Sequence, residues 1–161
     1  MARITAYTGA TLTVNIKEEV TLNNKDYGSL QSFTIASIAD INRRVLTITT
    51  TEASIINFAA AGAGGTFIPG KVQYMRFTNL DATNFITLTF TNSAGDEVAI
   101  KLDAGRSFIW TADIAAGMVG VMNATENANA NSDVALADMA LVQADANTAS
   151  CDLEFFIASI A

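Results

Sequence analysis

The stretch that decides the fold runs from Val72 to Trp110 and reads VQYMRFTNLDATNFITLTFTNSAGDEVAIKLDAGRSFIW. Residues 85–91 place Ile, Leu and Phe on one face and Thr on the other, which is the period-two pattern of a strand with one buried face. Residues 98–102 repeat this pattern, and the polar segment between the two contains Gly95, which can take the positive φ of a tight hairpin. The stretch therefore predicts four antiparallel strands at the core of a β-sandwich or barrel.

Similar patterns lie on both sides of this stretch. Segments in which apolar and polar residues alternate, or in which β-branched residues gather, predict further strands because their stiff side chains suit a pleated surface. These predicted strands span residues 11–17, 32–35, 44–50 and 151–160. In the first of them, Leu12, Val14 and Ile16 are expected to face inward.

Other segments are less regular. Residues 134–143 have the Ala content of a helix, but the spacing of Val134, Leu136, Ala140 and Val142 favours a strand. The apolar run at residues 55–58 fits a strand or a segment that covers an interface. Loops or turns are expected where Gly, Asn and small residues gather, at residues 23–28, 59–66 and 123–132.

Composition narrows the classes of function. The 161 residues fit one domain, residues 1–161, and no segment approaches the roughly 20 apolar residues that a membrane-spanning helix needs. The net charge of −7 disfavours binding to a nucleic-acid backbone, and the charged fraction of 16% favours a component of an assembly. The first ten residues lack a secretory apolar region and Cys151 is the single cysteine, so we expect synthesis in a reducing cytoplasm.

Catalysis and cofactor binding are not expected. The chain has no histidine, which removes histidine-based acid–base, nucleophilic and metal chemistry. Residues 65–71 match G-x-x-x-x-G-K, but a β pattern follows and Pro69 removes an amide donor, so a turn before a strand is the better interpretation. The carboxylate pairs at 18–19 and 96–97, and Asp152 with Glu154, are interpreted as solvated strand faces and turns.

The sequence suggests where a subunit interface lies. Phe155 and Phe156 are adjacent in a predicted strand and must face opposite sides, so one of them leaves the core and needs a partner. Arg43 and Arg44 likewise point to opposite faces, which fits a structural pair or an interface contact. The predicted interface residues are Phe156, Trp110, Tyr7, Arg43 and Arg44. Surface aromatic residues also leave a sugar-binding platform as an alternative.

Residues 74–88 and 102–110, YMRFTNLDATNFITL and LDAGRSFIW, resemble a pattern in small virion proteins of tailed bacteriophages. The resemblance covers the central third of the chain and carries no catalytic residues. Here Asp81 and Asn84 can cap a hairpin and Gly105 permits the next turn. The resemblance implies an all-β, antiparallel β-sandwich that is jelly-roll-like.

Within that group, the resemblance is strongest to a capsid decoration or cement protein. It implies a homotrimer on the capsid surface of the virion that binds the major capsid protein, with residues 1–9 as an N-terminal arm or edge strand. A tail, connector or fibre-base subunit of the same virion is the first alternative. A carbohydrate-binding module for host attachment is an alternative of another class.

Overall fold

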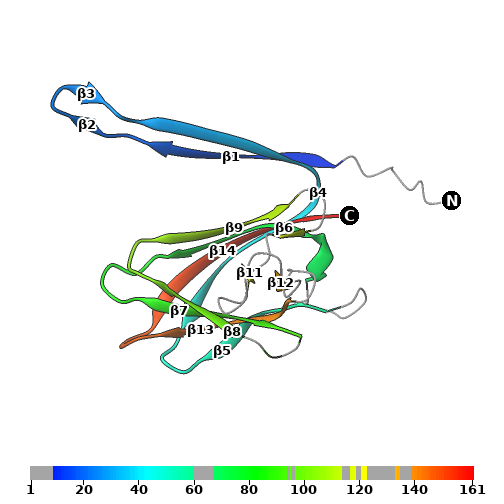
Figure 1. The fold of residues 1–161 in the computed structure, drawn as a ribbon. Helices are drawn as coiled ribbons and strands as arrows, with labels where there is room; N and C mark the ends of the chain where they lie inside the picture. Colours follow the sequence, from blue (N-terminus) through cyan, green and yellow to red (C-terminus); the bar gives the residue numbers. More distant parts are fainter. Residues whose placement is uncertain are drawn as a thin grey trace.

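A computed structural model describes residues 9–59, 67–93, 95, 97–113, 117–118, 121–122, 133–134 and 139–161. Almost all of its regular structure is antiparallel β-strand (Figure 1). The strands are β1 (Ala10–Glu18), β2 (Thr21–Leu22), β3 (Lys25–Asp26), β4 (Ser29–Ile48), β5 (Ala53–Asn57), β6 (Val72–Asn79), β7 (Ile86–Asn92), β8 (Glu97–Leu102), β9 (Ser107–Asp113), β10 (Gly117–Met118), β11 (Val121–Met122), β12 (Asp133–Val134), β13 (Met139–Ala146) and β14 (Cys151–Ile160). A short 3-10 helix, Pro69–Lys71, leads into β6.

The strands form a sandwich with jelly-roll connections. One sheet has the order β1-β4-β14-β6-β9-β10, which we call the six-stranded sheet, and the facing sheet has the order β5-β13-β7-β8. The pairs β4–β14, β5–β13, β6–β9 and β7–β8 are nested in the sequence, first strand with last and so on inward. This nesting is the long folded hairpin of a jelly roll, and it confirms the predicted all-β sandwich.

The central stretch forms the four predicted strands, shared between the two sheets. β6 pairs with β9 in the six-stranded sheet, whereas β7 pairs with β8 in the facing sheet. Gly95 and Gly105 have φ of +89° and +66° in the turns that precede β8 and β9. Asp81 caps the β6–β7 connection, because its Oδ1 accepts the backbone N–H groups of Thr83 and Asn84, each at 2.7 Å. The predicted hairpin is corrected here, because this connection crosses from one sheet to the other.

Inward-facing residues of both sheets form the main core. The apolar face of β7 and the alternating residues of β14 are buried, as the period-two pattern predicts. Phe90 lies at the centre, with its ring centroid 5.8 Å from that of Phe77 and 4.9 Å from that of Trp110. Cys151 is also buried there, and this burial raises the pKa of its thiol. Cys151 is therefore a small core residue, as expected.

A long β-hairpin projects from the sandwich (Figure 1). It consists of β1, β2, β3 and the first half of β4, residues 10–38, and we call it the arm. At its tip, Asn23 and Asn24 both have positive φ, 51° and 62°, which is the conformation of a tight two-residue hairpin turn. The turn predicted at residues 23–28 is therefore confirmed at Asn23–Asn24, whereas Lys25–Asp26 form strand β3.

The arm corrects two predictions. Residues 32–35 and 44–50 are predicted in two separate strands, but residues 32–35 and 44–48 both lie in β4, which runs without a break from the arm into the sandwich and ends at Ile48. The strand at residues 11–17 was expected to face the sandwich core, but it lies in the arm, where Val14 is buried and Ile16 is 42% exposed. Alternation predicted correctly that these residues form β-strand. It did not predict which surface the apolar face of the arm covers.

Irregular pairing marks the place where the arm leaves the sandwich. The register of β4 shifts against β1 between residues 10 and 12, and against β14 at residues 159–160. Ser37 lies within the first of these irregular stretches, between Ile35 and Ile38 of β4, and has a φ of +61°. Gly9 lies so close that a Cβ there would be 2.5 Å from the Cα of Ser37. Such bulges bend and twist a strand, and this bend separates the arm from the sheet.

Of the remaining sequence predictions, some concern described residues and others concern residues that the structure does not describe. In the ambiguous segment at 134–143, Val134 lies in β12 and residues 139–143 lie in β13, so its described residues are strand but belong to two strands. Residues 55–57 lie in β5. The predicted arm or edge strand at residues 1–9 lies outside the described residues except for Gly9, and so does Tyr7. The loops predicted at 123–132 and over most of 59–66 also lie outside them.

Candidate functional site

The described residues hold no group of three or more His, Cys, Asp or Glu side chains that could bind a metal ion. Among these same residues, no helix is long and apolar enough to cross a membrane. Of the carboxylates considered from the sequence, Glu18 and Asp152 are exposed and accept hydrogen bonds from Ser29 and Thr47. The candidate site is the outer face of the six-stranded sheet, where a network of charged and hydroxyl side chains connects neighbouring strands.

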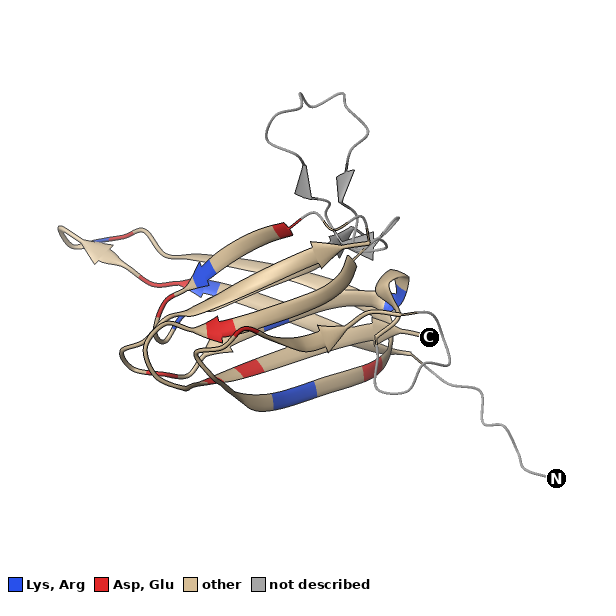
Figure 2. Cartoon of the chain, turned by 90° about the horizontal axis from the view of Figure 1, so that it is seen from below, with Lys and Arg blue, Asp and Glu red and all other residues tan. Residues whose placement is uncertain are grey.

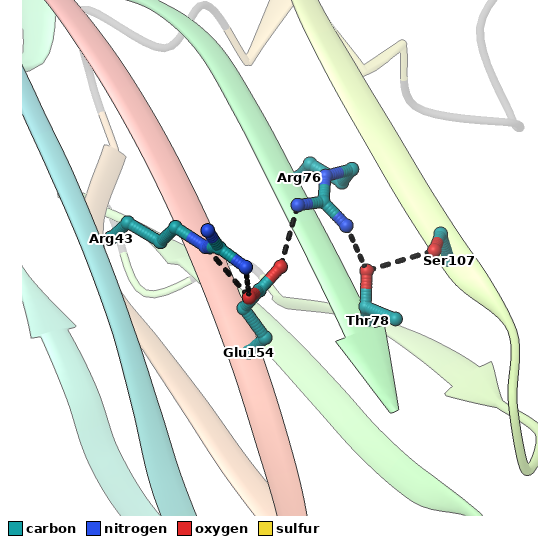
Figure 3. Close-up of polar contacts among 5 residues, drawn as sticks. All are labelled: Arg43, Arg76, Thr78, Ser107 and Glu154. Carbon is teal, nitrogen blue, oxygen red and sulfur yellow. Dashed lines mark hydrogen bonds and ion pairs between the residues drawn. The ribbon is translucent and has the colours of Figure 1, made fainter. Parts of the chain in front are cut away.

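A polar network crosses four strands of this face (Figure 3). Glu154 on β14 accepts hydrogen bonds at Oε2 from Nε of Arg43 at 2.7 Å and at Oε1 from Nη2 of Arg76 at 2.6 Å. The Nη1 of Arg76 donates to the hydroxyl of Thr78 at 2.5 Å, and that hydroxyl lies 2.8 Å from the hydroxyl of Ser107. The network therefore holds β4, β14, β6 and β9 together across their outer surface.

Glu154 corrects the prediction of a solvated carboxylate. Only 8% of the residue is exposed, and both of its oxygens are occupied by arginine. The hydrogen bond from Arg43, with that from Arg76, holds the pKa of Glu154 below its ordinary value although burial acts in the opposite direction. Glu154 is thus a fixed, charged part of the structure and not a candidate for acid–base catalysis.

The base of the arm packs on this same outer face. Val14 and Ile35 of the arm are buried in a second hydrophobic cluster together with Tyr74 of β6 and Ala158 of β14. Phe156 lies against the cluster, with its ring edge toward Tyr74 at a centroid distance of 5.9 Å. The outer face is therefore apolar near the arm and carries the charged network farther along the same strands.

Large exposed apolar side chains are concentrated on the arm and on β4. Five of the eight such residues in the described part of the chain lie in the arm, and two more lie on β4 beyond the bend. The five are Ile16, Val20, Leu22, Tyr27 and Leu30. The two are Ile41 and Val45, at 52% and 54% exposure. A continuous strand and its hairpin partner thus present most of the exposed apolar surface.

The residues predicted for an interface are not all on this surface. Arg43 and Phe156 lie on the outer face, where Arg43 belongs to the network and Phe156 is partly buried in the second cluster. Arg44 pairs in register with Phe155 and so points to the opposite side of the sheet, where it is exposed. Trp110 is 7% exposed and contributes to the main core, which removes it from the candidate surface.

The apolar residues of the arm were missed as a surface, although their signal was visible. Ile16 belongs to an alternating segment, and alternation normally indicates a buried face. Val20, Leu22 and Tyr27 flank the polar turn at 23–24, where a hairpin tip usually carries polar residues. Large apolar residues so close to a turn were the available indication that this hairpin exposes an apolar surface.

Charge is sparse over the whole molecule. Figure 2 shows that, over the described residues, the Lys and Arg positions and the Asp and Glu positions are short and separated along the chain. The arginine residues of the outer face share one carboxylate, so Arg43, with a side chain 65% exposed, retains positive charge at the surface. The outer face thus combines exposed apolar side chains with isolated charges.

Comparison of the chain with protein-family models, with curated proteins and with solved structures gave no match. The fold and the outer surface therefore define the class of protein, which is an all-β jelly-roll sandwich with a projecting hairpin arm.

Proposed function

We propose that this protein is a non-enzymatic structural component of a virion, which binds the outer surface of a phage capsid and stabilises it. The observation that carries the proposal is the arm, a well-formed hairpin whose large apolar residues are exposed in the single chain. An isolated two-stranded hairpin is marginally stable in water, so such an arm is expected to gain stability from a neighbour. The resemblance of residues 74–88 and 102–110 to small virion proteins of tailed bacteriophages supports the proposal that the particle is a phage virion.

The fold is compatible with this role. Jelly rolls serve as capsid, lectin and cupin domains, so the fold alone is an argument by analogy. The cupin role is disfavoured because the chain has no histidine to bind a metal. The weakly charged outer face with its apolar residues fits a lasting contact with the major capsid protein and with copies of this chain better than it fits a transient encounter.

Capsid binding can be tested with purified protein and capsids that lack it. We expect the protein to co-sediment with these capsids and to raise the temperature at which they release their genome. A variant with Leu22→Ser and Tyr27→Ser should bind more weakly, whereas Thr13→Ser with Asn15→Ser, also on exposed arm positions, should bind like the unchanged chain. Failure of the unchanged protein to bind would refute the capsid proposal.

Imaging can separate the capsid location from a location in the tail. Particles that carry a tagged copy of this chain should show the tag over the capsid surface. Density found only at the tail or the connector would assign the protein to that part of the virion and would contradict decoration of the capsid.

A further inference from the structure

We propose that the arm of one copy docks on the outer face of the six-stranded sheet of a second copy. This inference rests on the proposed role in an assembly, and it names the two surfaces through which copies of this chain associate. It does not depend on which particle the assembly decorates.

The arm is built as a docking element. Its tip is fixed by a two-residue turn, Asn23–Asn24, and by the hydrogen bond from the Gly28 N–H to Oδ1 of Asp26 at 2.7 Å. The turn at the tip is therefore specified by the local sequence. Ile16, Leu22 and Tyr27 are nevertheless 42%, 59% and 56% exposed, which is unfavourable unless they are covered in the functional state.

The outer face of the six-stranded sheet carries a matching uncovered surface. Ile41 pairs in register with Ala158, and Val45 with Glu154, so both point to the outer side of the sheet. Ile41 and Val45 are each more than half exposed, and Arg43 lies between them on the same face of β4. This part of the sheet lies beyond the region that the arm of the same chain covers.

The chain itself shows that the two surfaces fit each other chemically. In the second hydrophobic cluster, Val14 and Ile35 of the arm are buried against Tyr74 and Ala158 of the outer face. The apolar face of the arm continues past this contact to Ile16, and the outer face continues past it to Ile41 and Val45. A second copy extends the same kind of contact, arm on outer face, to the residues left uncovered in one chain.

Local charge favours a second copy as the occupant. The outer part of the arm, residues 17–30, has three acidic residues and two lysines, which gives a charge of −1. On the outer face, the two arginines of the network are balanced by Glu154 and by the exposed Asp152, and Arg43 is the exposed cation that lies between Ile41 and Val45. The molecule as a whole has a charge of −7, and placing the acidic outer part of the arm beside Arg43 reduces the repulsion between copies.

The oligomeric state tests the inference. Sedimentation velocity over a range of concentrations should show that the unchanged chain forms an oligomer. Ile16→Ser combined with Leu22→Ser should weaken association about a hundredfold. The control, Thr13→Ser with Asn15→Ser, should associate like the unchanged chain. Residues 13, 15, 16 and 22 are not part of the main core. Circular dichroism of each variant should therefore show the same β-sheet spectrum as the unchanged chain.

A cross-link tests which surface receives the arm. Two chains are prepared in a Cys151→Ala background, one with Leu22→Cys and an affinity tag, the other with Val45→Cys and no tag. After mixing and mild oxidation, we expect a covalent dimer that contains one chain of each kind. A control with Glu52→Cys in place of Val45→Cys, at another exposed position, should give much less of this mixed dimer.

Each result decides a separate question. A monomer at every concentration, or an oligomer that the arm substitutions leave unchanged, would overturn the inference. Equal yields of mixed dimer at residues 45 and 52 would also overturn it, because the arm would then have no preferred surface. Capsid binding by a chain that is monomeric in solution would leave the proposed function standing while this inference fails.

Discussion

Glu154 illustrates how one side chain fixes the outer face of the sheet. Its two oxygens receive guanidinium groups from strands on both sides, β4 and β6, so one buried carboxylate joins three strands. The alternating pattern of residues 151–160 gave its face correctly, because the outward direction follows from a period of two. The pattern could not show that Glu154 is buried on this outer face, since its burial depends on arginines that lie 111 and 78 residues away in the chain.

Removing the charge of Glu154 should destabilise the protein. In Glu154→Gln, Arg43 and Arg76 lose their counter-charge while Arg76 stays largely covered, and we expect a loss of about 2 kcal/mol in the free energy of unfolding by urea. Asp152→Asn is the matched control, because Asp152 is the preceding outward residue of the same strand and is exposed. Its loss should be about 0.5 kcal/mol or less. Equal losses in the two variants would show that the network does not contribute beyond an ordinary surface charge.

The same carboxylate predicts a dependence of stability on pH. The pKa of Glu154 is lower in the folded chain than in the unfolded chain, so its contribution is complete above the ordinary glutamate pKa of about 4.3 and is lost as the pH falls through the folded value. The difference in unfolding free energy between the unchanged chain and Glu154→Gln should therefore be larger at pH 6 than at pH 3.5. Asp81, whose pKa is also lowered by backbone hydrogen bonds, is present in both chains and does not affect this comparison. A difference that stays constant with pH would contradict the assignment.

At the scale of elements, β4 is the unusual feature. It spans 20 residues and changes its neighbour from β1 to β14 at the bend around Ser37. The sequence predicted two strands here because residues 36–40, ASIAD, include Ala, Ser and Asp, which do not favour strands. The structure keeps them in one strand because neighbours on both sides supply hydrogen bonds and the bulges absorb the irregular register.

The bend at Ser37 should tolerate glycine and reject a β-branched residue. Ser37→Val places a Cβ-branched side chain at a φ of +61°, which should cost about 1 to 2 kcal/mol in the free energy of unfolding. Ser37→Gly should stay within about 1 kcal/mol of the unchanged chain, since glycine adopts this φ without strain. Urea unfolding followed by circular dichroism measures both. A valine variant as stable as the glycine variant would mean that the positive φ is not maintained in solution.

At the scale of the whole molecule, the sandwich and the outer arm should be separable. Ile16 and Gln31 are paired in register, so residues 17–30 can be replaced by an Asn-Gly turn that closes the shortened hairpin. None of the removed residues is buried, and we expect the free energy of unfolding to change by about 0.5 kcal/mol or less. The shortened chain should also be monomeric in sedimentation. A large loss of stability would show that the arm tip belongs to the cooperative fold of one chain.

The sequence was informative about the sandwich and uninformative about the arm for one physical reason. Residues 86–90 and 151–157 alternate because both sheets cover one common core, and a period of two reports such burial directly. The arm also alternates, but its apolar face meets the outer side of a sheet whose strands lie far away in the sequence. The topology of the fold determines which surface an apolar face covers. The alternation of residues within one segment cannot predict that surface.

The unbroken path of β4 has a mechanical consequence. Force applied to the tip of the arm passes along this strand into its ladder with β14, which joins ten residue pairs from Cys151–Ile48 to Ile160–Ile38. The hydrogen bonds of this ladder lie across the direction of pull, so many of them resist together instead of opening one after another. An arm held by a neighbour would therefore transmit tension into the centre of the six-stranded sheet, which makes the projecting hairpin a tether that bears load.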